Sequence, residues 1–283
     1  MAGNNPVFSK FEQQASQQGY AGFGRNQAPT YPPQYPGPQG GYGPQDLDAL
    51  YQQPSAGPLQ TGRLTVDDVV MKTLGLFVLV LAAGGVSWVL TDSQPALTTP
   101  LWLGGMLVGL GLGLAISFMK KVSVPLILLY AVAEGLFLGA FSRVMEAAFP
   151  GVVTSAVVAT LATFAGMFAG YRFGIIKVTD KSRRIFGLAI LGYLVFSLVN
   201  VVALLAGWTS GWGFGGGGML GIAISLLGVG LAAYSLAMDF DSIDRAVRAQ
   251  VPQQYSWLLA HGLIVSLVWL YVEMLRLFAR LRD

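Results

Sequence analysis

Seven long apolar stretches fill the chain after residue 64, and they constrain its fold more than any other feature. Each approaches or exceeds the ~20 residues that an α-helix needs to cross a ~30 Å hydrocarbon core. Charged residues make up 11% of the chain, whereas an average soluble domain has about 25%. The sequence therefore predicts an all-α membrane protein, a seven-transmembrane-helix bundle in the cell membrane. The stretches are residues 66–90, 101–119, 122–142, 152–173, 184–206, 219–239 and 256–278.

The first 62 residues follow a different pattern. They are rich in Pro, Gly, Gln and Tyr and contain no run able to form a core. We predict a disordered cytoplasmic tail over residues 1–62, followed by one membrane domain over residues 63–283. Met1–Ser9 lacks the apolar run of a signal peptide, so the tail is expected to stay on the mature protein. Pro32–Tyr35 match a PPxY motif, which a segment of this composition often contains by chance.

The distribution of the 17 Lys and Arg residues predicts the orientation in the membrane. If the N-terminus is cytoplasmic, only Arg143 lies in an outer loop, while Arg276, Arg280 and Arg282 would lie outside if the seventh stretch crosses fully. The positive-inside rule favours this orientation. Arginines at an outer end would violate the rule, so a re-entrant seventh segment is an alternative. The cytoplasmic cations would be Lys10, Arg25, Arg63, Lys72, Lys120, Lys121, Arg172, Lys177, Lys181, Arg183, Arg184, Arg245 and Arg248.

Glycines at four-residue spacing indicate where helices approach closely. Without a hydrophobic drive between helices in lipid, small residues decide which faces meet. We predict tight helix contacts, rather than ligand contacts, at three such sets: Gly105, Gly109 and Gly113; Gly135 and Gly139; and Gly166 and Gly170.

Other polar features are predicted to be structural. Asn200 is expected to form an interhelical hydrogen bond. Trp208 and Trp212, in the uncharged loop GWTSGWGFGGGG, are expected to act as interfacial aromatic anchors on a flexible connector.

The sixth helix is predicted to continue to about Arg248, before Pro252 interrupts it. Asp241 and Asp244 precede Arg245 and Arg248 by four residues each, an order that favours intrahelical ion pairs.

Three acidic residues stand out as candidate functional groups. Glu134 lies about halfway along the third stretch, in LLYAVAEGLFLGAF, where an ionisable group is costly and usually functional. Asp239 directly follows the sixth stretch, and Glu273 lies within the seventh. His261 is a secondary candidate because its charge can change near neutral pH. Arg276 is another, since it lies three residues beyond Glu273 and therefore on the same helix face. Asp241, two residues beyond Asp239, is the third secondary candidate.

Several motifs resemble one known family. YAVAEG, AYSLAMDFDSI and WLYVEMLRLF are similar to segments of the Bax inhibitor-1 or transmembrane Bax inhibitor motif family, and NPVF and LTVDDVVMKT resemble its actinobacterial branch. The resemblance implies a central last helix wrapped by two three-helix layers. It also implies a pH-sensitive calcium leak controlled by two acids that share a proton, which correspond to Asp239 and Glu273 here.

Two arrangements of these groups remain open. In one, Asp239 pairs with Glu273, which requires a broken or strongly tilted helix, because straight helices at 1.5 Å per residue would hold the two acids at different depths. In the other, Glu273 pairs with Glu134, and Asp239 pairs with His261. Both arrangements place acids along a path through the bundle.

The leading hypothesis is a cation leak channel or exchanger, with Ca²⁺ as the favoured ion, gated by protonation of Asp239, Glu273 and Glu134. Oxygen ligands suit Ca²⁺, although Na⁺ or H⁺ would meet the same groups. The alternative is a non-conducting membrane regulator of a protease or stress-response complex that acts through the tail. It predicts that deleting residues 1–62 abolishes function, while neutralising Glu134 does nothing.

An enzyme is not expected. The chain has no cysteine, and an HExxH zinc motif and a GxSG-like nucleophile turn are both absent. We expect the lipid bilayer as a partner and no nucleic acid. No cofactor is expected either, and Ca²⁺ enters only as a transported ion.

Overall fold

The helices begin and end close to the predicted positions. The computed structural model describes residues 62–283 except 120, 210 and 217, all within one compact unit, Ser55–Asp283. The predicted tail and its Pro32–Tyr35 motif lie outside the described residues, apart from Gly62. The long helices are α3 (Val66–Ser93), α4 (Thr98–Phe118), α5 (Val124–Ala148), α6 (Val152–Arg172), α7 (Asp180–Leu205), α8 (Met219–Arg248) and α9 (Ser256–Arg282). Short 3₁₀ helices η1 (Pro95–Leu97), η2 (Gly213–Gly215) and η3 (Gln253–Tyr255) lie in the connections.

Local sequence signals explain several of these boundaries. The Thr65 hydroxyl accepts a hydrogen bond from the Asp68 backbone N–H, and the Asp68 carboxylate accepts one from the Thr65 N–H, so a capping box starts α3. Thr179 and Ser182 form the same arrangement at the start of α7. Helix α8 ends at Arg248, which confirms the predicted extension past its apolar run.

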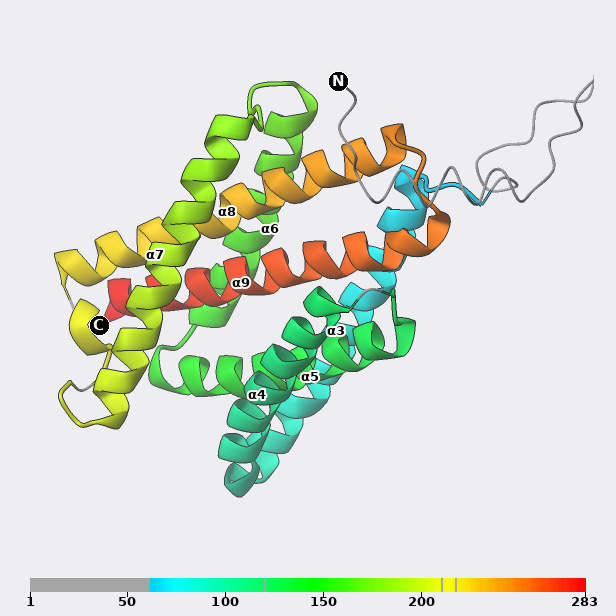
Figure 1. The fold of residues 1–283 in the computed structure, drawn as a ribbon. Coiled ribbons are helices and arrows are strands. Elements are labelled where there is room, and N and C mark those ends of the chain that lie inside the picture. Colours follow the sequence, from blue (N-terminus) through cyan, green and yellow to red (C-terminus); the bar gives the residue numbers. More distant parts are fainter. Residues whose placement is uncertain (1–61, 120, 210, 217) are drawn as a thin grey trace, which may run out of the picture. The chain divides into compact units, whose positions relative to one another are not determined.

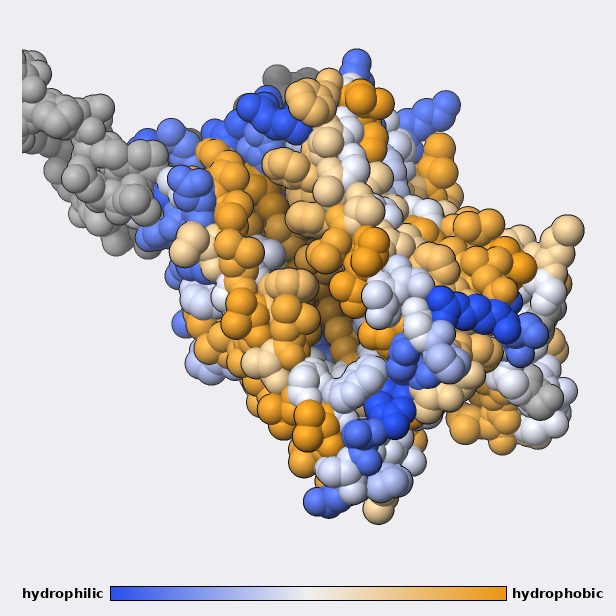
Figure 2. Space-filling model, turned by 180° about the vertical axis from the view of Figure 1, so that it is seen from behind, coloured by the Kyte–Doolittle hydropathy of each residue, from blue (hydrophilic) through white to orange (hydrophobic). Residues whose placement is uncertain are grey.

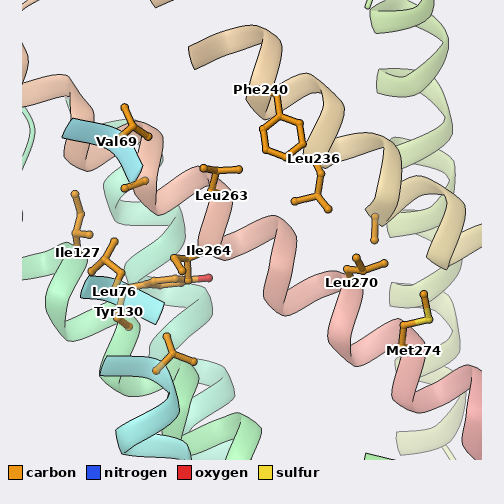
Figure 3. Packing of buried hydrophobic residues seen from close by; sticks show 14 of the residues in the cluster. Val69, Leu76, Ile127, Tyr130, Leu236, Phe240, Leu263, Ile264, Leu270 and Met274 are labelled. Carbon is orange, nitrogen blue, oxygen red and sulfur yellow. The ribbon is translucent and has the colours of Figure 1, made fainter. Parts of the chain in front are cut away.

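Helix α9 lies at the centre of the bundle, as the family resemblance implied. It contacts α3, α5, α6 and α8, whereas α4 packs mainly on α5 and α7 on α8 (Figure 1). Figure 3 shows Ile264 of α9 beside Leu76 of α3 and Tyr130 of α5. Farther along α9, Leu270 lies near Leu236 of α8. The core therefore follows α9, with α3, α4 and α5 on one side and α6, α7 and α8 on the other.

The predicted glycine contacts hold for α4 and α5. A Cβ built at Gly105 would lie 2.8 Å from the Phe137 backbone N, and one at Gly139 would lie 2.1 Å from the Gly84 carbonyl oxygen. The backbones of α3, α4 and α5 thus touch where side chains are missing. The prediction for Gly166 and Gly170 was wrong: a Cβ at Gly166 would meet no side chain or neighbouring helix of the described residues within 4 Å, and one at Gly170 would meet Ile176 of the following loop first. Spacing alone does not say which face of a helix meets a neighbour.

The bundle is a multi-pass membrane protein. All seven long helices are long and apolar enough to cross a bilayer. Many large hydrophobic side chains on them are exposed, such as Val78 on α3 at 63%, Leu107 on α4 at 62% and Leu198 on α7 at 64%. Figure 2 shows hydrophobic side chains over much of one face, with hydrophilic ones gathered near its margins. Exposed apolar surface of this extent is stable in lipid and would aggregate in water.

Helix α9 is continuous over 27 residues, so it is long enough to cross the membrane as a full helix rather than a re-entrant one. Its end is fixed at the connections between α5 and α6 and between α7 and α8. The Arg282 guanidinium donates hydrogen bonds to the Pro150 carbonyl and the Ser155 hydroxyl, and the Trp212 indole N–H donates to the Asp283 carboxylate at 3.1 Å. We refer to this end of the bundle as the Arg282 end, and to the opposite end, with the α8–α9 connection, as the Pro252 end.

Two structural predictions for the α7–α8 connection need correction. Asn200 does not bond to another long helix; its carboxamide oxygen accepts from the Phe214 N–H at 2.8 Å and so fixes η2. Trp208 is 75% exposed, but the Trp212 ring packs inward on Phe149, with ring centroids 6.3 Å apart. Asn200 bonds to the loop because a backbone N–H there needs an acceptor, whereas the Trp212 ring is held by contact with another aromatic ring.

Candidate functional site

Asp239 lies on the face of α8 that meets α9. The Ser266 hydroxyl donates a hydrogen bond to the Asp239 carboxylate at 2.5 Å. Gly262, one turn earlier on α9, lies beside the second oxygen, and a Cβ there would be in ordinary van der Waals contact with it at 3.6 Å. Asp239 is half-buried, and no Lys, Arg or His of the described residues lies within ion-pair distance of it. Within the described part of the chain, its hydrogen-bond partner is therefore a neutral hydroxyl.

Glu273 is the most deeply buried of the acidic candidates, with 2% of its surface exposed. One carboxylate oxygen accepts three hydrogen bonds: from the Tyr193 hydroxyl at 2.7 Å, the Trp269 indole at 3.2 Å and the Arg276 guanidinium at 3.2 Å. The predicted proximity of Arg276 is confirmed. The other oxygen has no hydrogen-bond partner among the described residues and points at Gly228 of α8, where a Cβ would lie 2.6 Å away.

Asp239 and Glu273 thus face the same α8–α9 interface at different levels. Gly228, which meets Glu273, lies 11 residues before Asp239 on the continuous helix α8, or about 16 Å along its axis. No hydrogen bond joins the two carboxyl groups. Neither helix is broken here, so nothing draws the two acids to one level. The second predicted arrangement, Glu273 with Glu134 and Asp239 with His261, also shows no direct hydrogen bond within the described part of the chain.

Glu134 lies at a separate position, between α4 and α5. It is 9% exposed, and a Cβ at Gly109 of α4 would lie 2.7 Å from its carboxylate oxygen. Tyr130, one helical turn earlier, packs edge-on against His261 of α9 with ring centroids 4.4 Å apart. His261 is 5% exposed, and its Nδ1 atom has no hydrogen-bond partner in the described range. Glu134 and His261 therefore flank the same tyrosine from two helices.

A third polar contact on the α8–α9 interface was not predicted. The Arg280 side chain of α9 is 4% exposed and donates hydrogen bonds to the Gly221 carbonyl at 2.5 Å and the Ser225 hydroxyl at 2.9 Å. Together with the contacts above, it completes what we call the α8–α9 seam, a row of small and polar residues along two apolar helices. The seam comprises Gly221, Ser225, Gly228 and Asp239 of α8 and Gly262, Ser266, Glu273 and Arg280 of α9.

A family model described as Bax inhibitor 1 like matches residues 5–283, which is nearly the whole chain. The chain belongs to this family. No curated protein matches it. The three candidate acids of this Bax inhibitor 1-like protein lie on three different helices: Glu134 on α5, Asp239 on α8 and Glu273 on α9.

Asp241, a secondary candidate in this Bax inhibitor 1-like protein, joins three helices at the Pro252 end. It forms the predicted i,i+4 ion pair with Arg245 at 3.2 Å. It also pairs with Arg183 of α7 and lies 3.5 Å from the Tyr171 hydroxyl of α6. Asp244 forms its predicted pair with Arg248 at 2.7 Å. These contacts hold α6, α7 and α8 together, so the geometry of Asp241 is that of a structural ion pair.

The Bax inhibitor 1-like chain also has a cavity of about 400 Å³ between α3, α5, α6 and α9. Apart from Ser142, Thr160 and Tyr271 its lining is apolar, and none of the candidate acids reaches it. It therefore suits hydrocarbon rather than an ion. The seam is the better candidate site, because it collects the polar groups that an ion or a proton could use.

The seam has a sequence signal that could have revealed part of it. Gly221, Ser225 and Gly228 recur every three or four residues, so they share one face of α8. Asp239 continues that face. No comparable signal marks Arg280, because a terminal arginine in this pattern is normally solvated.

Proposed function

We propose that this protein is a pH-sensitive cation leak channel or exchanger in the cell membrane, with a cytoplasmic N-terminus and with Asp239, Glu273 and Glu134 as its protonation sites. One observation carries the proposal: two acidic side chains, Asp239 and Glu273, line a single seam between two membrane-spanning helices. An ionisable group at such a position is expensive, and transport of ions or protons is the usual reason for it.

The hydrogen bonds of the seam support a role for protonation. A carboxyl group in a low-dielectric interface is costly when charged unless a cation or several donors compensate it. Among the described residues, a hydroxyl is the hydrogen-bond partner of Asp239 and no cation pairs with it, whereas Glu273 already pairs with Arg276 through one oxygen. Loss of the Asp239 proton would place negative charge without a paired cation in the seam, which attracts cations and favours separation of α8 from α9. We therefore expect cation flux to rise with pH.

The chemistry of the seam favours a hard cation. Carboxylate and hydroxyl oxygens are ligands that Ca²⁺ accepts, and Na⁺ and protons can use the same groups. The described residues contain no group of three or more His, Asp or Glu side chains that could hold a metal ion together. Single, separated oxygen sites suit an ion that passes through rather than one that stays. Bax inhibitor-like proteins are generally not enzymes, and the proposal requires no reaction.

The test is flux into liposomes that contain a calcium-sensitive dye, with the external pH stepped from acidic to alkaline. The double variant Asp239→Asn, Glu273→Gln should lose the pH dependence, and Glu134→Gln should reduce it. Asp244→Asn is the matched control, because this acid lies on the same helix but pairs with Arg248 outside the seam. Unchanged, pH-dependent flux in the double variant would reject the mechanism.

The contacts of the residues between the tail and α3 favour a second candidate function. In it, the protein is a non-conducting regulator of a protease or stress complex. The Leu64 N–H donates to the Val251 carbonyl and the Gln253 N–H to the Gly62 carbonyl, each at 2.9 Å. The Gln253 carboxamide also donates to Asp68 at 2.7 Å. The chain thus enters the bundle paired with the α8–α9 connection, so a partner bound to the tail would act on that connection.

Deletion of residues 1–60 separates the two functions, because it removes the tail while keeping the pairing at Gly62. A regulator would lose its effect on stress survival or proteolysis in cells, whereas purified protein in liposomes would be unaffected. A leak channel would keep its flux and its pH dependence. Glu134→Gln should have the opposite pattern, with altered flux and an unaltered regulatory effect.

A further inference from the structure

Arg280 combines burial with the absence of an acidic partner. Its side chain is 4% exposed, and no carboxylate of the described residues lies within ion-pair distance of it. Two neutral acceptors on α8, a carbonyl and a hydroxyl, hold the guanidinium, and the Trp212 ring lies 5.3 Å from it. The Nε atom of Arg280 has no hydrogen-bond partner within residues 62–283 as the structure describes them. Buried arginines are nearly always paired with acids, so this arrangement requires an explanation.

Its neighbours leave the local charge positive. Glu273 is already compensated by Arg276 at 3.2 Å. Arg280 lies seven residues beyond Glu273 on α9, about 10 Å along the axis, and the Asp283 carboxylate near it is bonded to the Trp212 indole and forms no ion pair with Arg280. The part of the seam nearest the Arg282 end therefore carries one uncompensated positive charge.

We infer that Arg280 is the electrostatic barrier of the α8–α9 seam, a fixed positive charge that excludes cations while α8 and α9 are packed together. This inference rests on the proposed function, since it says which residue keeps the same ion path closed. A cation that moves from Asp239 past Glu273 towards the Arg282 end must pass the guanidinium. A single charged arginine in a narrow, low-dielectric passage is sufficient to block cations.

The contacts of Arg280 also allow it to move. Its acceptors are neutral, and hydrogen bonds to a carbonyl and a hydroxyl are exchanged for water at little net cost. Separation of α8 from α9 at Gly221 and Ser225 would remove both acceptors at once. The barrier would then leave the seam in the same movement that deprotonation of the acids favours. An ion pair with a buried carboxylate would resist this displacement.

Two substitutions distinguish a charge barrier from a structural clamp. Arg280→Gln removes the charge but retains N–H donors for the Gly221 carbonyl, whereas Arg280→Lys retains the charge and loses the planar guanidinium. If Arg280 is a charge barrier, the Gln variant should leak cations at least about tenfold faster than the wild type at acidic pH. The repulsion between the guanidinium and a cation in such a passage exceeds the ~1.4 kcal/mol that corresponds to a tenfold change in rate. The Lys variant should behave like the wild type.

The measurement uses liposomes loaded in parallel with calcium-sensitive and chloride-sensitive dyes. The Gln variant should raise calcium flux and leave chloride flux unchanged, since only cations lose a barrier. Arg282→Gln is the matched control; this arginine lies two residues farther along, bonds to the α5–α6 connection and should leave both fluxes unchanged. Thermal unfolding in detergent shows whether each variant is folded.

Equal increases in the Gln and Lys variants, or a rise in chloride flux with calcium flux, would overturn the inference and identify Arg280 as a clamp. So would a Gln variant with wild-type calcium flux. Should the Gln variant not fold, Trp212→Leu removes one support of the guanidinium and should raise calcium flux by a smaller factor; no increase there counts against the barrier. The proposed function fails separately, if wild-type flux does not respond to pH or to Asp239→Asn, Glu273→Gln.

Discussion

The α3–α5 contact and the α8–α9 seam both depend on glycine, but different groups face the glycines. At Gly135 and Gly139 the missing side chains let two backbones meet, with the Val80 and Gly84 carbonyl oxygens 2.5 Å and 2.1 Å from where Cβ atoms would lie. At Gly228 the missing side chain makes room for a carboxyl group and the Tyr193 hydroxyl. The first contact brings helices together, and the second accommodates polar groups between helices.

This difference indicates which region can change shape. A backbone contact has no side chain that can rotate away, so α3 and α5 should move as one body. The seam contains hydroxyl, carboxyl and guanidinium groups, whose hydrogen bonds can exchange for water. Helix α9 contacts both regions, so it can separate from α8 while α3 and α5 remain packed. The comparison predicts that equivalent glycine substitutions affect stability in one region and transport in the other.

The largest expected effect is at Gly139. Gly139→Ala places a methyl group against the Gly84 carbonyl oxygen, which cannot move without separating α3 from α5. Overpacking costs about 1–3 kcal/mol and occasionally more, and a backbone oxygen that cannot rotate away puts this substitution at the upper end. We expect a large loss of folded protein in detergent, measured by size-exclusion chromatography and thermal unfolding. Gly166→Ala, in open space on α6, is the control and should be neutral or stabilising by up to about 1 kcal/mol. Equal behaviour of the two variants would remove the basis of the comparison.

A smaller effect on folding and a larger one on transport are expected for Gly228→Ala. The new methyl group would meet only the ends of the Glu273 and Tyr193 side chains, which can rotate away at the expense of their hydrogen bond. We expect folded protein whose cation flux has a displaced pH dependence. Adding Tyr193→Phe should not shift it further, because both changes break the same hydrogen bond. A variant that unfolds as readily as Gly139→Ala would show that this glycine, too, serves packing alone.

The sequence was sufficient to predict the bundle but not its seam. Apolar length predicts each helix independently of its neighbours, which is why all seven helices and the end of α8 at Arg248 were found. The partners of a buried polar group depend on helix rotation and tilt, which no local pattern encodes. For this reason Ser266 and Tyr193 were missed, although Asp239 and Glu273 were identified as candidates. The prediction for Gly166 failed for the same reason: its four-residue spacing from Gly170 fits a helix-contact motif, but it lies on a face of α6 that meets no other described helix.

The smallest effect is expected at the Arg143–Asp92 ion pair, which joins α5 to α3 at the Arg282 end with atoms 2.6 Å apart. Both side chains are substantially exposed, at 31% and 57%, and exposed pairs contribute only about 0–1 kcal/mol. Asp92→Asn should therefore change the unfolding temperature little and leave the flux unaltered, because α3 and α5 are held by their glycine contact and lie outside the seam. The matched variant at the other end, Asp241→Asn, should cost more, because its carboxylate is 18% exposed and pairs with both Arg183 and Arg245. If Asp92→Asn instead altered flux without altering stability, α3 and α5 could not be a passive frame, and the contrast between a rigid region and a mobile seam would have to be abandoned.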